Sequence, residues 1–268
     1  MPLKYILILI ILFLRWNVLA QSQPSTELSG SLESDRQLNM QNLNPSVNAV
    51  STGLTPSSSR IQPMAPTLQA GAIYNANNLP QNGTTDLWFK IPNWRSGEFH
   101  REIQTDFTLA GPKTFKSAVN HFYGFQTDKI GQIWNYVSYP YTEKVVNQNY
   151  TDIKLVIFFE VLKITNELYS IHCITNDIIV NNSNNQIVKS YQTEDFQAFK
   201  QVANNVAEAH CHSQFFDSHG QAISESQKYL FQETRIKDYK PTNFWNGKDL
   251  SISFANFLLA NHLNNLIP

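Results

Sequence analysis

Charge is scarce in this sequence, and several familiar signatures are missing. Only 15% of the 268 residues are Asp, Glu, Lys or Arg, and the formal net charge is −1. A chain without excess positive charge has no broad attraction for nucleic acid or anionic lipid. It also contains no Walker loop, G-x-G-x-x-G, H-E-x-x-H or G-x-S-x-G motif. We therefore expect no nucleic-acid partner, no cofactor and no catalytic residues of these recognisable types.

Uninterrupted apolar runs are short outside the N-terminus. Lys4 precedes the apolar segment 5–14, and Val-Leu-Ala at 18–20 offers small or apolar residues before a cleavage point. This pattern predicts a signal peptide over residues 1–20, cleaved after Ala20. An uncleaved anchor is the alternative, but Arg15 interrupts the run and a bilayer span needs about 20 residues. We expect an exported protein, periplasmic, in the cell envelope or extracellular, with no integral membrane span after cleavage.

Cysteine is nearly absent, with only Cys173 and Cys211 in the chain. In an oxidising compartment these two residues are candidates for a single disulfide. Free thiols are the alternative, because Cys packs well as a small hydrophobic side chain. The sequence leaves both readings open.

Aromatic residues are rare in the segment 21–83, which is rich in Ser, Gln, Asn and Pro. Such a composition buries too little apolar surface to offset the entropy cost of ordering. We expect a disordered tether here, with folding on a partner as the alternative. A β-rich domain is then expected over 84–268.

Alternating and continuous apolar runs dominate that domain. Strands are expected over 97–107, 152–165 and 167–180, because β-branched and aromatic residues fill them. Asp-x-x-Gly turns at 128–131 and 217–220 favour hairpins. The predicted fold is mainly β, an antiparallel meander that forms a lipocalin-like barrel or a strongly curved sheet. A disordered N-terminal third and a short C-terminal helix over 249–263 complete it.

The segment 193–210 is ambiguous. Phe196, Phe199, Val202 and Val206 have helical spacing, with Thr193 as a possible cap. The Asn pair at 204–205 is typical of a turn instead. A helix and a turn between strands are both compatible with this segment.

The stretch LWFKIPNWRSGEFHRE, residues 87–102, opens the domain. Pro92 favours a turn or 3₁₀ entry, and Gly97 and Phe99 then begin an extended run. This arrangement resembles the Gly-x-Trp opening of the lipocalin-like (calycin) superfamily, although Phe99 replaces the Trp. The resemblance implies that Trp94 supplies the missing indole and that Arg235, from the last strand, packs over the closed end. It also implies an apolar cavity for a small ligand or a barrel that binds a protein.

Four histidines are the candidate metal ligands. His210 and His212 share one face of a strand, and His172 or His219 could add a third ligand. Ordinary strand and turn positions are the simpler interpretation, so no metal is predicted. The leading hypothesis is a non-catalytic exported binding protein that holds a small apolar ligand or docks an envelope protein. The alternative is a metal-dependent or hydrolytic secreted enzyme that uses the His210/His212 cluster.

Overall fold

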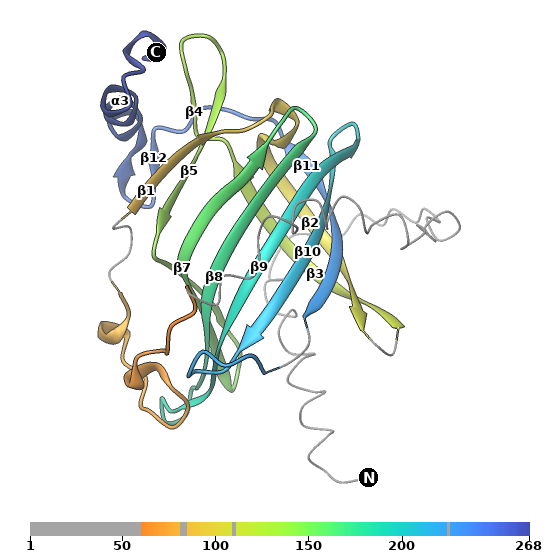
Figure 1. The fold of residues 1–268 in the computed structure, drawn as a ribbon, viewed down its shortest axis with the longest axis vertical. Coiled ribbons are helices and arrows are strands. Elements are labelled where there is room, and N and C mark those ends of the chain that lie inside the picture. The colour runs from red at the N-terminus through yellow and green to blue at the C-terminus, as the bar shows by residue number, and fades with distance from the viewer. Residues whose placement is uncertain (1–59, 81–84, 109–110, 224–225) are drawn as a thin grey trace.

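The computed structural model describes residues 60–80, 85–108, 111–223 and 226–268. The predicted signal peptide and residues 21–59 of the predicted tether lie outside this part of the chain. The described fold is mainly β, an antiparallel meander curled into a half-barrel with one short C-terminal helix (Figure 1). Among these residues there is no helix with the length and apolar character that a membrane crossing requires.

The main sheet has eight antiparallel strands in the order β3-β2-β11-β10-β9-β8-β7-β6. Most neighbours in the sheet are also neighbours in sequence, as in a meander. Within the described residues β3 and β6 are the two edges and do not pair with each other, so the curled sheet stays open. The strands are β2 (Gly97–Thr108), β3 (Gly111–Tyr123), β6 (Tyr141–Val146), β7 (Tyr150–Ile164), β8 (Leu168–Asn181), β9 (Ile187–Ala203), β10 (Val206–Phe216) and β11 (Gln227–Lys237).

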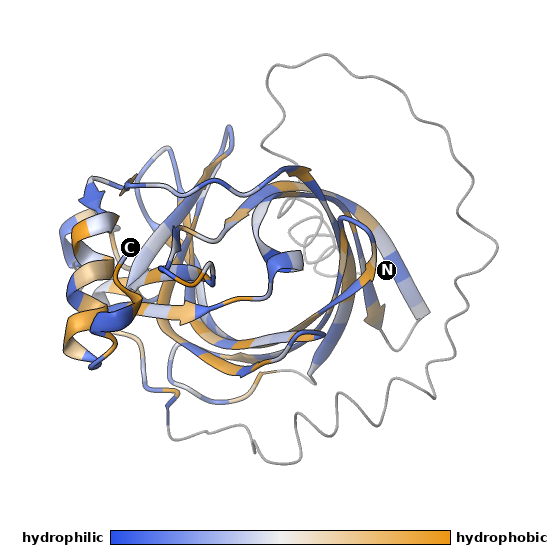
Figure 2. Cartoon of the chain, turned by 90° about the horizontal axis from the view of Figure 1, so that it is seen from above, coloured by the Kyte–Doolittle hydropathy of each residue, from blue (hydrophilic) through white to orange (hydrophobic). Residues whose placement is uncertain are grey.

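A smaller layer carries the C-terminal helix, which lies outside the curled sheet (Figure 2). A second sheet has the order β1-β5-β4, with β1 (Thr85–Lys90), β4 (Gln126–Thr127) and β5 (Ile133–Tyr139). The short hairpin β12 (Phe244–Trp245) and β13 (Lys248–Asp249) leads into α3 (Leu250–Ala260). Asp249 caps the helix by accepting a hydrogen bond from the Ile252 amide at 3.0 Å. Phe254 and Leu258 then pack on Trp88 and Trp134, which gives this layer its own apolar core.

The two Asp-x-x-Gly turns form as the sequence predicts. The Asp128 carboxylate accepts from the amides of Ile130 and Gln132, and Gly131 has a φ of 86°. Asp217 makes the equivalent pair of bonds, and Gly220 has a φ of 84°. Each Asp thus bonds the turn while the Gly adopts the left-handed backbone that L side chains disfavour.

The ambiguous segment 193–210 is not helical. β9 continues to Ala203, the turn lies at the Asn pair, and Asn205 has a φ of 61° before β10 begins. Phe196 and Phe199 point to opposite faces of β9, and both faces are covered by other side chains. A strand that is apolar on both faces mimics helical spacing, which explains the ambiguity.

Residues 60–80 form a strap on the convex face of the half-barrel, although they fall within the segment expected to be a disordered tether. Ile61, Met64 and Leu68 are buried, the last two against Ile153 and Ile178 of the sheet. The backbone is held as well, since the Met64 amide donates to the Ser218 carbonyl at 2.8 Å and Gly71 to that of Ile187 at 2.8 Å. Three apolar side chains are enough to dock this otherwise polar strap, because the convex face of the sheet is apolar where they contact it.

Candidate functional site: the concave face of the half-barrel

Strand alternation gives the half-barrel a concave face whose side chains are aromatic near one end and polar farther along. Register places side chains in rows across neighbouring strands. The row nearest that end contains Tyr169, Phe199, Ala209, Phe231 and Gln104. The next contains Ile171, Gln197, Cys211, Tyr229 and Asp106, and the third contains Cys173, Asp195, Ser213 and Gln227.

The 3₁₀ turn η5 (Asn93–Arg95) closes the aromatic end, where a short turn lies across the mouth of the curled sheet (Figure 2). Arg95 is fully buried, and its guanidinium carbon lies 3.6 Å from the ring centre of Tyr123 and 4.0 Å from that of Phe199. Its Nη1 donates to a carboxylate oxygen of Glu233 at 2.6 Å. Arg95 therefore acts as a plug held by aromatic rings and one ion pair.

Glu233 is the matching anion of this plug. Its second carboxylate oxygen lies 2.7 Å from Nδ1 of His121. Burial by itself would raise the pKa of Glu233, but Arg95 and His121 outweigh that effect and lower the pKa to about 2. Glu233 is thus fully ionised at neutral pH, as the buried guanidinium requires.

The four barrel-closing candidates from the sequence lie at this same end. Arg235 donates from Nη2 to the carbonyl oxygens of Asn93 and Trp94, both at 2.9 Å, and its guanidinium carbon lies 5.5 Å from the ring centre of Phe99. The Trp94 indole packs at the edge of the aromatic core and donates to the Asn166 carbonyl at 2.6 Å. The fully buried guanidinium is that of Arg95, whose role the sequence does not signal.

Gly97 joins η5 to β2 in a conformation reserved for glycine. Its φ is 115°, and a Cβ at this position would collide with the backbone oxygen of Lys237. The missing side chain lets the start of β2 lie against the end of β11, which brings Arg235 over η5.

Farther from η5 the concave face carries buried carboxylates. Asp177 accepts hydrogen bonds from the hydroxyls of Thr175 at 2.9 Å and Thr193 at 2.8 Å. Asp195 accepts one from the hydroxyl of Ser213. All five side chains are buried. Hydroxyl donors satisfy part of each carboxylate, and Lys154 on the same face brings one positive charge near both.

Three side chains of the concave face are partly exposed. Lys154, Cys173 and Tyr229 each keep accessible surface. Burial nevertheless is the largest influence on all three, and it raises the pKa of Cys173 and of Tyr229. For Lys154 burial would lower the pKa, but attraction to Asp177 and Asp195 raises it instead. These three partly exposed side chains mark the accessible part of the concave face, which we call the recess.

The two cysteines are free thiols in this structure and both lie on the concave face. Cys173 is paired across the strands with Asp195, and Cys211 with Gln197, so β9 runs between them. The disulfide option is therefore not realised in the described fold, since a bridge needs the two Cα atoms within about 7 Å.

The four candidate histidines do not converge on one site. His172 is buried on the convex side, with its ring nitrogens 3.0 Å from Glu160 and 2.9 Å from Glu194, and stacks on Phe196. His210 and His212 share the convex side as alternation predicts, but His210 lies 2.9 Å from a Glu208 oxygen. His219 belongs to the Asp217 turn. In the described part of the chain no three His, Cys, Asp or Glu side chains gather as a metal site.

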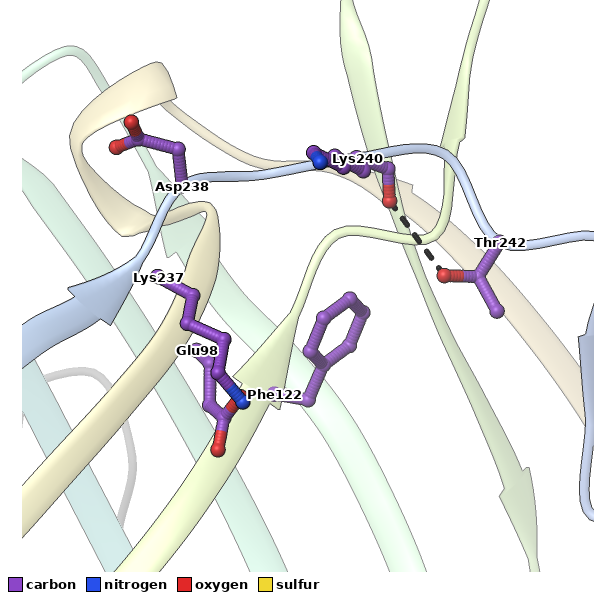
Figure 3. Close-up of a pocket in the computed structure, with 6 residues that line it drawn as sticks. All are labelled: Glu98, Phe122, Lys237, Asp238, Lys240 and Thr242. Atoms are coloured by element: carbon purple, nitrogen blue, oxygen red, sulfur yellow. Dashed lines mark hydrogen bonds and ion pairs between the residues drawn. The ribbon is translucent and has the colours of Figure 1, made fainter.

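A surface pocket of about 440 Å³ lies outside the half-barrel, beside the ends of β2, β3 and β11 (Figure 3). Its wall includes the ring of Phe122 and the ion pair between Glu98 and Lys237, whose charged atoms are 2.7 Å apart. Asp238 and Lys240 lie at its exposed rim. Its charged groups are satisfied or solvated, so it offers less to a ligand than the concave face does.

Sequence reasoning missed most of the residues that give the concave face its chemistry: Arg95, Lys154, Asp177, Asp195 and Glu233. A signal existed for some of them, because the strands 167–180 and 187–203 carry charged residues where a core-facing strand would be apolar. No protein-family model matches the chain, and neither a curated protein nor a solved structure matches it.

Proposed function

We propose that the chain is an exported, non-catalytic binding protein that holds a small ligand against the concave face of its half-barrel. The observation that supports this proposal is that Lys154, Cys173 and Tyr229 share the concave face and are partly exposed there. Concave sites with aromatic walls and a few convergent polar groups are the usual form of small-molecule sites. The signal-peptide pattern at 1–20 supports export to the periplasm, cell envelope or extracellular space.

A ligand site of the lipocalin-like kind is part of this proposal. An open meander, closed at one end by an aromatic and arginine-rich turn, supports a ligand with an apolar body seated toward Phe231 and the aromatic rows. The charged half of the face adds a place where a polar group on that ligand can find partners.

The test is binding of a neutral fluorescent apolar probe, N-phenyl-1-naphthylamine. We expect saturable 1:1 binding that the variant Cys173→Trp weakens at least about tenfold, since an indole fills the recess. The matched control, Lys228→Trp, places the same indole on the exposed convex side of β11 and leaves binding unchanged. Circular dichroism checks that both variants fold. Absence of saturable binding, or equal binding by both variants, would overturn the proposal.

A second candidate function is docking of a protein partner at the C-terminal layer. Phe244 is 68% exposed at the β12–β13 hairpin, and Ile252 and Leu259 are exposed along one side of α3. Exposed apolar side chains gathered on one layer are typical of interaction surfaces. A photo-crosslinking amino acid at position 252 should capture a defined partner in the native host, whereas the same group at position 228 should not. Equal labelling at both positions would contradict this candidate.

The enzyme alternative based on His210 and His212 has less support. Both histidines lie on the face opposite the recess, and His210 is engaged by Glu208. A nucleophile or metal placed there would act on the outer surface of the sheet.

A further inference from the structure

A buried acceptor and a carboxylate without a cation lie side by side on the concave face of β2. Gln104 is only 5% exposed, and its amide nitrogen donates to Oδ1 of Asp106 at 2.8 Å. The other carboxylate oxygen of Asp106 accepts from the amide of Gln227. These two amide donors hold the carboxylate in one orientation but bring it no positive charge.

The orientation of the Gln104 amide follows from this contact. Its NH₂ group must face the carboxylate, because an oxygen there would repel it. The amide oxygen therefore points elsewhere, and it has no hydrogen-bond partner although it is buried. A buried polar atom left without a partner costs about 1–3 kcal/mol, so this oxygen needs a donor that the described chain does not provide.

The charge of Asp106 is likewise uncompensated. Within the described residues it forms no ion pair within 4 Å. Burial raises its pKa, and only the amides of Gln104 and Gln227 act in the other direction. Lys113 is opposite Asp106 in β3, but its side chain is exposed and forms no ion pair with any residue that the structure describes. Arg101, on the same strand, lies 4.3 Å from the ring centre of Phe231 instead.

Aromatic surface borders the same position. Phe231 is paired with Gln104 across β11, and Tyr229 with Asp106. Their rings are 6.2 Å apart and nearly parallel. On the other side, Phe115 of β3 is paired with Gln104. The partly exposed rings of Phe115 and Tyr229 offer contact to an apolar chain, and a ring face also favours a neighbouring cation.

We infer that the ligand of the concave face is a protonated amine with an apolar body, whose ammonium group binds Asp106 and the amide oxygen of Gln104. An ammonium has three donors and no acceptor, which matches two acceptors and an unpaired negative charge. This inference rests on the proposed function and adds the class of head group that the recess selects.

The experiment compares three probes with the same ten-carbon chain: decylamine, decanol and decanoate, titrated into the full chain at pH 7 by calorimetry. We expect decylamine to bind at least about tenfold more tightly than decanol, and decanoate most weakly, since charge-assisted hydrogen bonds are the stronger ones. If none of the three binds, the proposed function itself fails. If decanol or decanoate binds as well as decylamine, the recess binds amphiphiles but the inference about amines is wrong.

Two variants of β2 test whether Asp106 binds the ammonium group. Asp106→Asn should remove the preference for decylamine, measured as the ratio of decylamine affinity to decanol affinity in the same variant. The matched control is Glu98→Gln, which neutralises another carboxylate of β2 that is paired with Lys237 outside the recess; it should retain the preference. A preference that survives Asp106→Asn would overturn the assignment to this residue, and the comparison of head groups in the unmodified protein holds even if that variant does not fold.

Discussion

Substitution of Glu233 should destabilise the fold severely, because it leaves a cation buried without its anion. Arg95 is fully buried and its Nη1 lies 2.6 Å from the Glu233 carboxylate. Removing one partner of a buried ion pair typically costs about 3–5 kcal/mol. We expect Glu233→Gln to lower the free energy of unfolding by that amount.

The lowered pKa of Glu233 links the same carboxylate to a pH dependence of stability. Against the desolvation that would raise it, Arg95 and His121 lower the pKa from 4.5 to about 2. At about 1.4 kcal/mol for each pKa unit, the ionised carboxylate contributes about 3 kcal/mol at neutral pH. Because the folded pKa is depressed, this contribution is complete above about pH 4.5 and is lost as the pH falls through about 2.

Urea denaturation at pH 7 measures the effect. The double variant Arg95→Met with Glu233→Met should recover most of the lost stability, since apolar replacement of a buried pair is often neutral. Glu98→Gln is the control: its partner Lys237 is exposed, and such surface pairs are worth about 0–1 kcal/mol. A loss below about 1 kcal/mol for Glu233→Gln, or a double variant less stable than the single one, would refute the reasoning.

Three further predictions concern the convex face and the closed end. Burial would lower the pKa of His172, but Glu194 and Glu160 raise it above 6.5, so its stabilisation is complete below pH 6.5 and is lost as the pH rises through the folded value. In His212, by contrast, burial and then Lys228 lower the pKa. NMR titration should give a pKa above 6.5 for His172 and below 6.5 for His212. Two pKa values on the same side of 6.5 would contradict these contacts. Leu68→Ala should cost about 2–5 kcal/mol in urea denaturation, whereas Ile73→Ala, at a site 64% exposed, should cost less than about 0.5; equal costs would mean that the strap is not docked. Gly97→Ala should lower the thermal midpoint by at least about 4 °C, because its φ of 115° and the adjacent backbone exclude a Cβ, and an unchanged midpoint would show that β2 begins differently.

The sequence predicts the strands, turns and helix that depend on neighbouring residues. Apolar runs over 152–165 and 167–180 predict β7 and β8, and Asp128 with Gly131 predicts the turn between β4 and β5. Asp249 and Ser251 are both possible caps that predict the C-terminal helix, and Asp249 is the one that caps it. Each of these depends on residues close together in sequence, where steric preference and hydrogen-bonding chemistry decide the outcome.

Contacts between residues far apart in the sequence could not be predicted in the same way. Arg95 and Glu233 are 138 residues apart, and nothing near either residue indicates its partner. Leu68 is buried only because the convex face of β7 and β8 is apolar at the point where the strap crosses it. The candidate site also depends on contacts between distant residues, since Gln104 and Gln227 meet at Asp106 only after the sheet has formed.

The central claim is that the concave face holds the ligand, and NMR of the full chain with decylamine tests it most directly. Intermolecular NOEs should connect the decylamine methylenes to the ring protons of Phe231 and Tyr229, which border the recess. NOEs confined to the exposed rings of Phe244 and Trp245 would place the ligand on the outer layer and contradict the account.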